Sequence, residues 1–237
     1  MAQAFVQAVS AQVTSAATSC TTTGITTTSG DLIVLLGFES SGVTFAATPL
    51  SDSKSNTWTA GIATFGTTNK QIEKFDANGT RGASHTFTCT TTTSAFPAVA
   101  AVEFSGMDLT TSCIDKTATT ADASSTNPHT SAATATTTQA DEAVVCASNT
   151  SAGTATYVDN VGTLCTSQNN TAGTPLGVGY RLVTATGTYS ASFNITAGTV
   201  VASQSTSTWK EAAPGGAPPG LGPALLMQPD MTMPVGW

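Results

Sequence analysis

The sequence predicts an all-β protein: a jelly-roll-like antiparallel β-sandwich built from two similar halves, with an extended C-terminal arm. Three observations predict it: an apolar run bracketed by glycines, an echo of its leading segment 110 residues later (26 to 136), and an abrupt change to proline and glycine at residue 214. The run is GDLIVLLGF at residues 30–38, with five large aliphatic side chains in a row. A short run that is apolar at both side-chain parities is typical of a strand covered on both faces.

The two halves are predicted from a repeated pattern. The segment TTTSGD at 26–31 is echoed by TTTQAD at 136–141, and each leads into an apolar run. Trp209 also stands roughly where Phe104 stands in the first half. We therefore expect a β-sandwich domain over residues 1–213, with half-repeats at about 4–107 and 130–211. A β-barrel is the competing architecture.

The remaining elements follow from alternation and turn residues. Residues 39–55 are polar and rich in turn formers, and residues 108–138 form a nearly featureless Thr, Ala and Ser connection between the halves. The Asn78-Gly79 pair is the strongest hairpin signal in the chain. We expect strands at 4–13 (an edge strand), 30–38, 57–65, 71–75, 85–93, 98–104, 141–148, 154–164, 176–184, 187–197 and 199–210.

Composition excludes several classes of function. Charged residues make up 9% of the chain, against about 25% in ordinary globular proteins. The net charge is −7 and the seven Lys and Arg residues are scattered, so we expect neither nucleic-acid binding nor binding to anionic membranes. No apolar run approaches the ~20 residues of a membrane span. The N-terminal segment lacks a basic region and a continuous apolar core, so we expect a protein made and assembled in a cytoplasm; a mature fragment with an added Met is the alternative.

The cysteines and histidines indicate no cofactor or metal site. The five cysteines show no CxxC spacing, and we expect free, mostly buried thiols, with one or two disulfides as the open alternative: Cys20, Cys89, Cys113, Cys146 and Cys165. Neither His85 nor His129 lies in a recognisable nucleophile motif, and only a triad assembled in space stays open.

Two acidic segments also favour structural roles, and we predict no catalytic, cofactor-binding or metal-binding residue. Glu103 lies on an apolar strand without a second carboxylate, so a hydrogen-bonded or edge-facing role is favoured over the acid pair of a glycosidase. Residues 52–56, DSKSN, place oxygen ligands at alternate positions like a calcium loop, but turn chemistry explains them better. Trp58 and Trp209 lie in predicted strands, so we expect core residues; a sugar-stacking platform formed with Trp237 is the alternative.

The C-terminal segment 214–237 is predicted to be an extended docking arm. Its six prolines and five glycines exclude helix and sheet interior and favour polyproline-like chain. Disordered linkers are usually polar, but this segment is apolar. We therefore predict that it binds a partner subunit, with packing on its own sandwich as the alternative, through Leu221, Leu225, Leu226, Met227, Met231, Met233 and Trp237.

Taken in order, several segments resemble the jelly-roll-type β-sandwich domains of bacteriophage structural proteins, which also occur in bacterial secreted or surface proteins. The likeness covers about residues 4–211 and is carried by GDLIVLLGF, DSKSNTW, HTFTC, AVAAVEFSGMD, TTTQADEAVV and YRLVTATGTYSASF. In the phage setting such domains resemble capsid decoration or head-fibre proteins, which sit on the shell as trimers and carry no catalytic residues.

The resemblance implies a non-enzymatic virion structural protein, a capsid decoration or minor capsid protein, assembled in the host cytoplasm. Its expected partners are the major capsid protein or other virion subunits and further copies of itself, with a trimer favoured. Two alternatives stay open: a carbohydrate-binding or adhesin module of a bacterial surface protein, and a sandwich-fold glycosidase or lyase.

Overall fold

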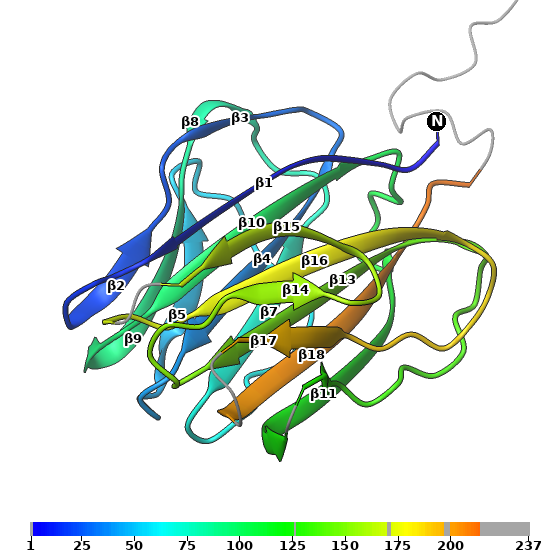
Figure 1. The fold of residues 1–237 in the computed structure, drawn as a ribbon. Coiled ribbons are helices and arrows are strands. Elements are labelled where there is room, and N and C mark those ends of the chain that lie inside the picture. Colours follow the sequence, from blue (N-terminus) through cyan, green and yellow to red (C-terminus); the bar gives the residue numbers. More distant parts are fainter. Residues whose placement is uncertain (1, 126, 170–171, 197–199, 214–237) are drawn as a thin grey trace, which may run out of the picture.

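The computed structural model describes residues 2–125, 127–169, 172–196 and 200–213, and within them the chain is all β and contains no helix (Figure 1). The first half comprises β1 (Ala4–Gln12), β2 (Ala17–Thr21), β3 (Ile25–Thr27), β4 (Leu32–Glu39), β5 (Phe45–Asp52), β6 (Thr59–Ala60), β7 (Lys70–Asp76), β8 (Gly82–His85), β9 (Phe87–Ala95) and β10 (Ala98–Ser105). The second comprises β11 (Ile114–Ser125), β12 (His129–Thr130), β13 (Asp141–Thr150), β14 (Tyr157–Asp159), β15 (Thr163–Gln168), β16 (Leu176–Thr184), β17 (Ser192–Ile195) and β18 (Val200–Lys210).

The two halves have the same strand order. The five-stranded sheets run β1-β10-β4-β7-β6 and β11-β18-β13-β16-β15, and the three-stranded sheets run β2-β9-β5 and β12-β17-β14. In each half the pairs are nested: β1 with β10, β2 with β9 and β4 with β7, then β11 with β18, β12 with β17 and β13 with β16. A small extra sheet, β3-β8, occurs in the first half. The repeat suggested by the threonine-rich echo is therefore present in the topology.

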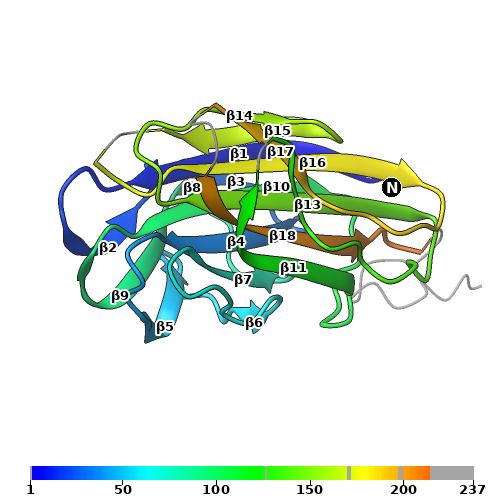
Figure 2. The same cartoon turned by 60° about the horizontal axis from the view of Figure 1, so that its bottom comes forward.

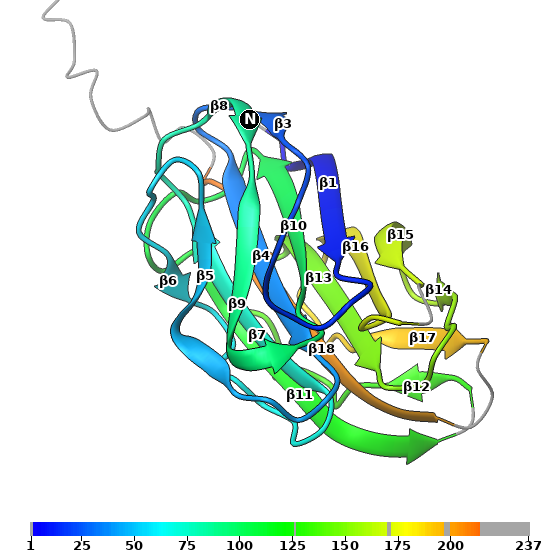
Figure 3. The ribbon, with the colours of Figure 1, turned by 90° about the vertical axis from the view of Figure 1, so that its left-hand side faces the viewer.

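The sheets stack as four layers, with the two five-stranded sheets in the middle (Figure 3). Between these two sheets lies a core shared by both halves, in which Leu32, Val34 and Phe104 of one sheet meet Val145 and Trp209 of the other. Each three-stranded sheet covers the outer face of its own half and forms a further core there. Because β4 and β13 have both faces covered, β4 is buried along its whole length and β13 at every residue after Asp141. The predicted central strands are thus confirmed.

Strand register shows which residues occupy equivalent positions. Leu32 pairs with Phe104 in the first half, and Ala143 pairs with Trp209 in the second, and all four face the shared core. With Phe104 and Trp209 taken as equivalent, the offset between their partners on the central strands is 143 − 32 = 111 residues, one more than the offset of the sequence echo. A shift of one residue moves a side chain to the opposite face of a sheet. The offset of 111 therefore matches residues that face the same core, whereas the offset of 110 would match residues on opposite faces.

Several segments differ from the sequence-based expectation. The predicted strand over 154–164 is divided between β14 and the start of β15, and within the described residues the one over 187–197 shrinks to β17. The supposed connection contains the long strand β11, so the second half begins at Ile114, before the predicted boundary at residue 130. The supposed turn region contains β5, whose register shift between Phe45 and Leu50 hides the alternation of a strand. The predicted strand over 57–65 shrinks to the two residues of β6 and a bridge at Phe65.

The Asn-Gly signal does not mark a hairpin. β7 pairs with β4 and β6, while β8 pairs with β3 in another sheet, so the chain changes sheets at Asn78-Gly79. Neither residue has a positive φ, which a two-residue type I′ hairpin turn requires at both central positions. Here tertiary packing overrides the local turn preference.

Trp209 is fully buried in the shared core and contacts Phe75 edge to face, with ring centroids 5.0 Å apart. We predict that Trp209→Ala lowers the free energy of unfolding by about 3–5 kcal/mol, because a large cavity would open between the halves. Urea denaturation measures this. Val158→Ala, at a side chain 55% exposed, serves as control and is expected to cost less than about 0.5 kcal/mol. A loss below about 1 kcal/mol for Trp209→Ala would contradict the shared core.

Candidate functional site

A polar seam runs through one side of the shared core. There Gln71 of β7 donates from Nε2 to Asn149 Oδ1 at 2.9 Å and to the Ser203 carbonyl at 2.6 Å. Ser205 Oγ donates back to Gln71 Oε1 at 2.9 Å. All four residues are buried, and the seam joins β7 of the first half to β13 and β18 of the second. Because buried amides and hydroxyls are costly when unpaired, these bonds fix how the two halves align.

Glu73 lies at the end of the seam and carries its most unusual group. Ser207 Oγ donates to Glu73 Oε2 at 2.9 Å, and Trp209 Nε1 donates to Ser207 Oγ at 2.9 Å. The other carboxylate oxygen, Oε1, is buried without a hydrogen-bond partner. Burial raises the pKa of Glu73 to about 8, which the hydrogen bond from Ser207 opposes only in part. The side chain is therefore protonated at neutral pH.

A second contact between the halves centres on Asp122, in the β11 bulge. Its carboxylate accepts the backbone N–H groups of Thr67 (2.5 Å), Thr68 (3.2 Å) and Asn69 (2.8 Å), and the Thr67 hydroxyl at 2.7 Å. Asp122 has a φ of 43°, in the left-handed region that Asp and Asn tolerate best after Gly. Although burial opposes it, these donors lower the pKa of Asp122 to about 2. The successive backbone N–H groups of residues 67–69 thus form an anion-binding site of the kind called a nest, and the Asp122 carboxylate of the other half occupies it.

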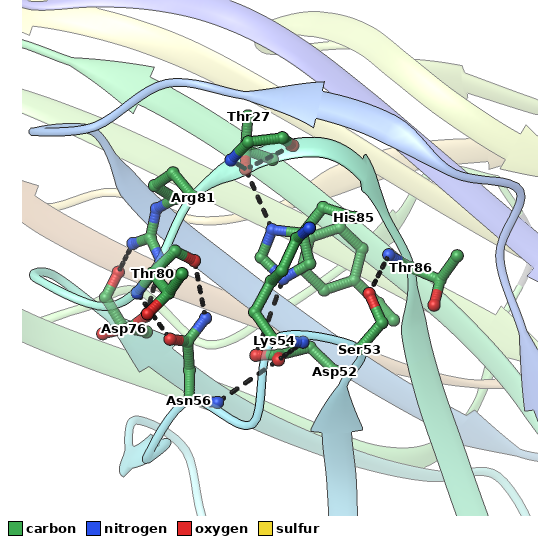
Figure 4. Close-up of polar contacts among 12 residues, drawn as sticks. Thr27, Asp52, Ser53, Lys54, Asn56, Asp76, Thr80, Arg81, His85 and Thr86 are labelled. Atoms are coloured by element: carbon green, nitrogen blue, oxygen red, sulfur yellow. Dashed lines mark hydrogen bonds and ion pairs between the residues drawn. The ribbon is translucent and has the colours of Figure 1, made fainter.

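The structure also assembles a hydroxyl, an imidazole and a carboxylate in line (Figure 4). Thr27 Oγ1 lies 2.9 Å from His85 Nδ1, and His85 Nε2 lies 3.7 Å from Asp52 Oδ2. The order is that of a catalytic triad, the arrangement in space that the sequence left open for His85. However, Thr27 is 4% exposed and the side chains of His85 and Asp52 are fully buried.

Because Thr27, His85 and Asp52 are enclosed, we assign them a structural role. Desolvation lowers the pKa of His85, and the nearby Asp52 carboxylate opposes that shift. The Thr27 hydroxyl also accepts the Gly82 N–H at 3.2 Å, which ties it to the β3-β8 sheet. A nucleophile must be reached by its substrate, and this hydroxyl is enclosed.

The segment Asp52–Asn56 forms a turn, as expected. Asp52 Oδ1 accepts the N–H groups of Lys54 at 2.7 Å and Asn56 at 3.3 Å. Asn56 in turn bonds the backbone of Thr80 through both its amide oxygen and its nitrogen (Figure 4). The carboxylate is thus used within the turn, and the residues that the structure describes contain no group of three His, Cys, Asp or Glu side chains suited to a metal ion.

Glu103 is hydrogen-bonded, as the sequence indicated. It accepts from Gln7 Nε2 at 2.5 Å and from the Thr28 N–H at 2.6 Å. The structure adds a second carboxyl that the sequence pattern missed: Asp31, from the turn before β4. Burial, followed by the charge of Glu103, raises the pKa of Asp31 to about 6. Both carboxyls are buried.

The threonine echo has a matching role in each half. Thr28 donates its N–H to Glu103, and Thr138 donates its N–H to Asp115 Oδ2 at 2.5 Å. Each bond anchors the segment that leads into a central strand, β4 or β13. The echo therefore marks a carboxylate-capped entry to the strand.

Other predicted residues have clear positions. Trp209 is buried and Trp58 is half-buried, packed edge to face on Phe87, so both contribute to cores. Within the described chain the five cysteines are free thiols, four buried and Cys165 half-buried. The arm residues lie outside the described residues: Leu221, Leu225, Leu226, Met227, Met231, Met233 and Trp237.

No sequence pattern indicated the seam or the Asp122 contact. Ser203, Ser205 and Ser207 alternate along a predicted strand, but small polar side chains at period two usually indicate a solvent-facing side. Asp122 lies in a stretch of Thr and Ala without periodicity, so nothing in the sequence around it indicated a partner.

Comparison with protein-family models, curated proteins and solved structures found no match for this chain. In the part of the chain that the structure describes, no helix could cross a membrane.

We predict that Glu73→Gln removes a pH dependence of stability. The buried carboxyl keeps its proton up to about pH 8, whereas the unfolded one releases it near 4.5. Between these values the unfolded state binds fewer protons, so the stability of the wild type falls as pH rises. Urea denaturation of both proteins from about pH 5 to about pH 9 should show the wild type losing stability relative to the variant. A difference independent of pH would contradict a protonated Glu73.

We predict the opposite sign for Asp122→Asn. The lowered pKa means that the carboxylate stabilises the fold above about 3.8 and that this contribution is lost as pH falls through about 2. At neutral pH the variant should lose about 1–2 kcal/mol, because several charge-assisted bonds weaken at a half-buried site. Asn tolerates the left-handed backbone, so strain is not introduced. Asp141→Asn, at an exposed residue, is the matched control, and an equal loss in both would contradict the role of the loop.

Proposed function

We propose that this chain is a non-enzymatic virion structural protein: a bacteriophage capsid decoration or minor capsid protein that assembles in the host cytoplasm. It would form a homo-oligomer, with a trimer favoured, and bind the major capsid protein or other virion subunits through the arm at 214–237. The observation that carries the proposal is the nested strand pairing repeated in both halves. We infer that each half is a jelly roll, because that fold is a long antiparallel hairpin rolled into two sheets. Jelly rolls are common in viral capsid and lectin domains, and the step from fold to function is one of analogy.

The outer faces support a role in assembly. The outward side of the β2-β9-β5 sheet carries several uncharged hydroxyls, at Ser19, Thr21, Ser51, Thr88 and Thr90. Copies of such a surface can approach a crowded shell without strong electrostatic repulsion. Most buried carboxyl groups, in contrast, serve contacts within the molecule, as Glu73 and Glu103 do.

The arm would supply the binding energy. Its Leu, Met and Trp side chains would contribute about 25 cal/mol for each Å² of apolar area buried on the partner. Its prolines lower the conformational entropy lost on docking.

The lectin-like alternative needs an exposed aromatic platform. Trp209 is buried and Trp58 is half-buried, so neither offers an open ring for a sugar. A glycosidase would need two carboxyls that its substrate can reach. Asp31 and Glu103 lie near each other, but both are buried.

We predict that deleting residues 214–237 leaves the β-sandwich folded but abolishes its association with particles. Circular dichroism and urea denaturation report the fold, and copurification with assembled capsids reports the association and its stoichiometry. Replacing Leu225 and Leu226 by Ser in the full chain is the milder control, expected to weaken the association in part. Unchanged saturation of capsids by the truncated protein would refute the arm as the anchor.

A further inference from the structure

A groove of about 290 Å³ opens on the outer face of β7. It lies where the three-stranded sheet of the first half ends, between β5 and β7, on the side of the molecule where β6 is also found (Figure 2). Its lining is largely apolar and includes Phe45, Ala47, Pro49 and Ile72. One charge, Lys74, lies among them, and within the described residues its ammonium has neither a hydrogen bond nor an ion pair.

The second half shows what covers the equivalent face. Leu35 pairs with Lys74, and its counterpart Cys146 pairs with Gly179, so Lys74 and Gly179 occupy equivalent positions. By the same register Ile72 corresponds to Gly177.

In the second half, β14 lies directly on these glycines. A Cβ atom at Gly179 would meet Asp159 Oδ2 at 1.9 Å, and one at Gly177 would meet the Tyr157 ring at 2.6 Å. The face is thus closed by an extended segment that carries one carboxylate and one large ring. In the first half β5 packs on β4 instead, and the side chains of Ile72 and Lys74 are left to line the groove.

We propose that this groove binds the segment Met227–Met233 of a second copy of this chain; this inference rests on the proposed function of the arm. The segment MQPDMTM is rich in methionine and contains Asp230, which is the one charged residue of 214–237. An apolar groove with one cation thus meets an apolar segment with one anion. A polyproline II chain repeats every three residues, so it would place Met227, Asp230 and Met233 along one edge. That edge supplies the acid for Lys74 and apolar side chains on either side of it.

Chain direction favours a second copy over the same chain. The described chain ends at Ala213, just after β18 has paired with the start of β13, and Glu211 bridges to Met107. The groove lies further back along the molecule, since Ile72 pairs with Gly37 near the far end of β4. To reach its own groove the arm would have to reverse direction through a proline-rich stretch, and proline fixes φ and stiffens the chain.

A charge swap in the full-length chain tests the proposal. Sedimentation velocity would measure the dissociation constant of self-association for the wild type, Lys74→Glu, Asp230→Lys and the double variant. Each single variant is expected to weaken association by about tenfold or more, because like charges would then face each other. The double variant should return to within about threefold of the wild type, since coupled residues are not additive. Lys54→Glu is the control: among the described residues the Lys54 ammonium donates to the Ala83 carbonyl, and the change should have no effect on association.

The outcomes separate this inference from the proposed function. A wild type that is monomeric at about 100 µM, or single variants that associate normally, would overturn the groove as the site for a second copy. A double variant that stays as weak as the singles would overturn the pairing of Lys74 with Asp230. Copurification with capsids is measured on the same variants, and a monomeric Lys74→Glu that still binds particles would leave the proposed function standing.

Discussion

The face-to-face contact of the two five-stranded sheets is the constraint on which the rest of this structure depends. Each of these sheets is buried on both faces. One face packs against the three-stranded sheet of its own half, and the other packs against the other half. Strands buried on both faces need apolar side chains at both parities, which explains the aliphatic run in β4. The same contact leaves the small sheets on the outside, where their outer faces can be hydroxyl-rich.

Polar residues set the alignment of that contact. An apolar interface alone tolerates sliding, whereas the bonds of Gln71 and Asn149 are satisfied in one register only. Asp122 adds an ionic contact between the halves at the edge of the interface. Glu73 is different, because burial keeps it protonated and one of its oxygens is unpartnered. The seam thus fixes one alignment of the two halves, while the buried Glu73 lowers the stability of the fold as pH rises.

The two halves share a strand order but differ in the side chains at equivalent positions. Equivalent positions on β7 and β16 hold Ile72 and Lys74 in one half and Gly177 and Gly179 in the other. Glycine lets β14 lie against the sheet and close the face, while larger side chains hold the corresponding face open. In a fold with two similar halves, one half can thus have this face covered while the equivalent face of the other half is free to bind a partner. Our proposal for the groove requires this difference.

Local sequence patterns were enough to predict the β class, the central strands β4 and β13, the two similar halves and the burial of Trp209, because apolar runs and alternation are local signals of a covered strand. The four layers, the offset of 111 residues between matching core positions, and the strands β5 and β11 become visible only in the folded chain. Bulges and runs of Thr and Ala remove the period-two pattern from these two segments. They are strands because they pair with a neighbouring strand, and their own sequence does not indicate it. The Asp122 contact and the Gln71 seam join residues 53 or more positions apart, a pairing that no local pattern records.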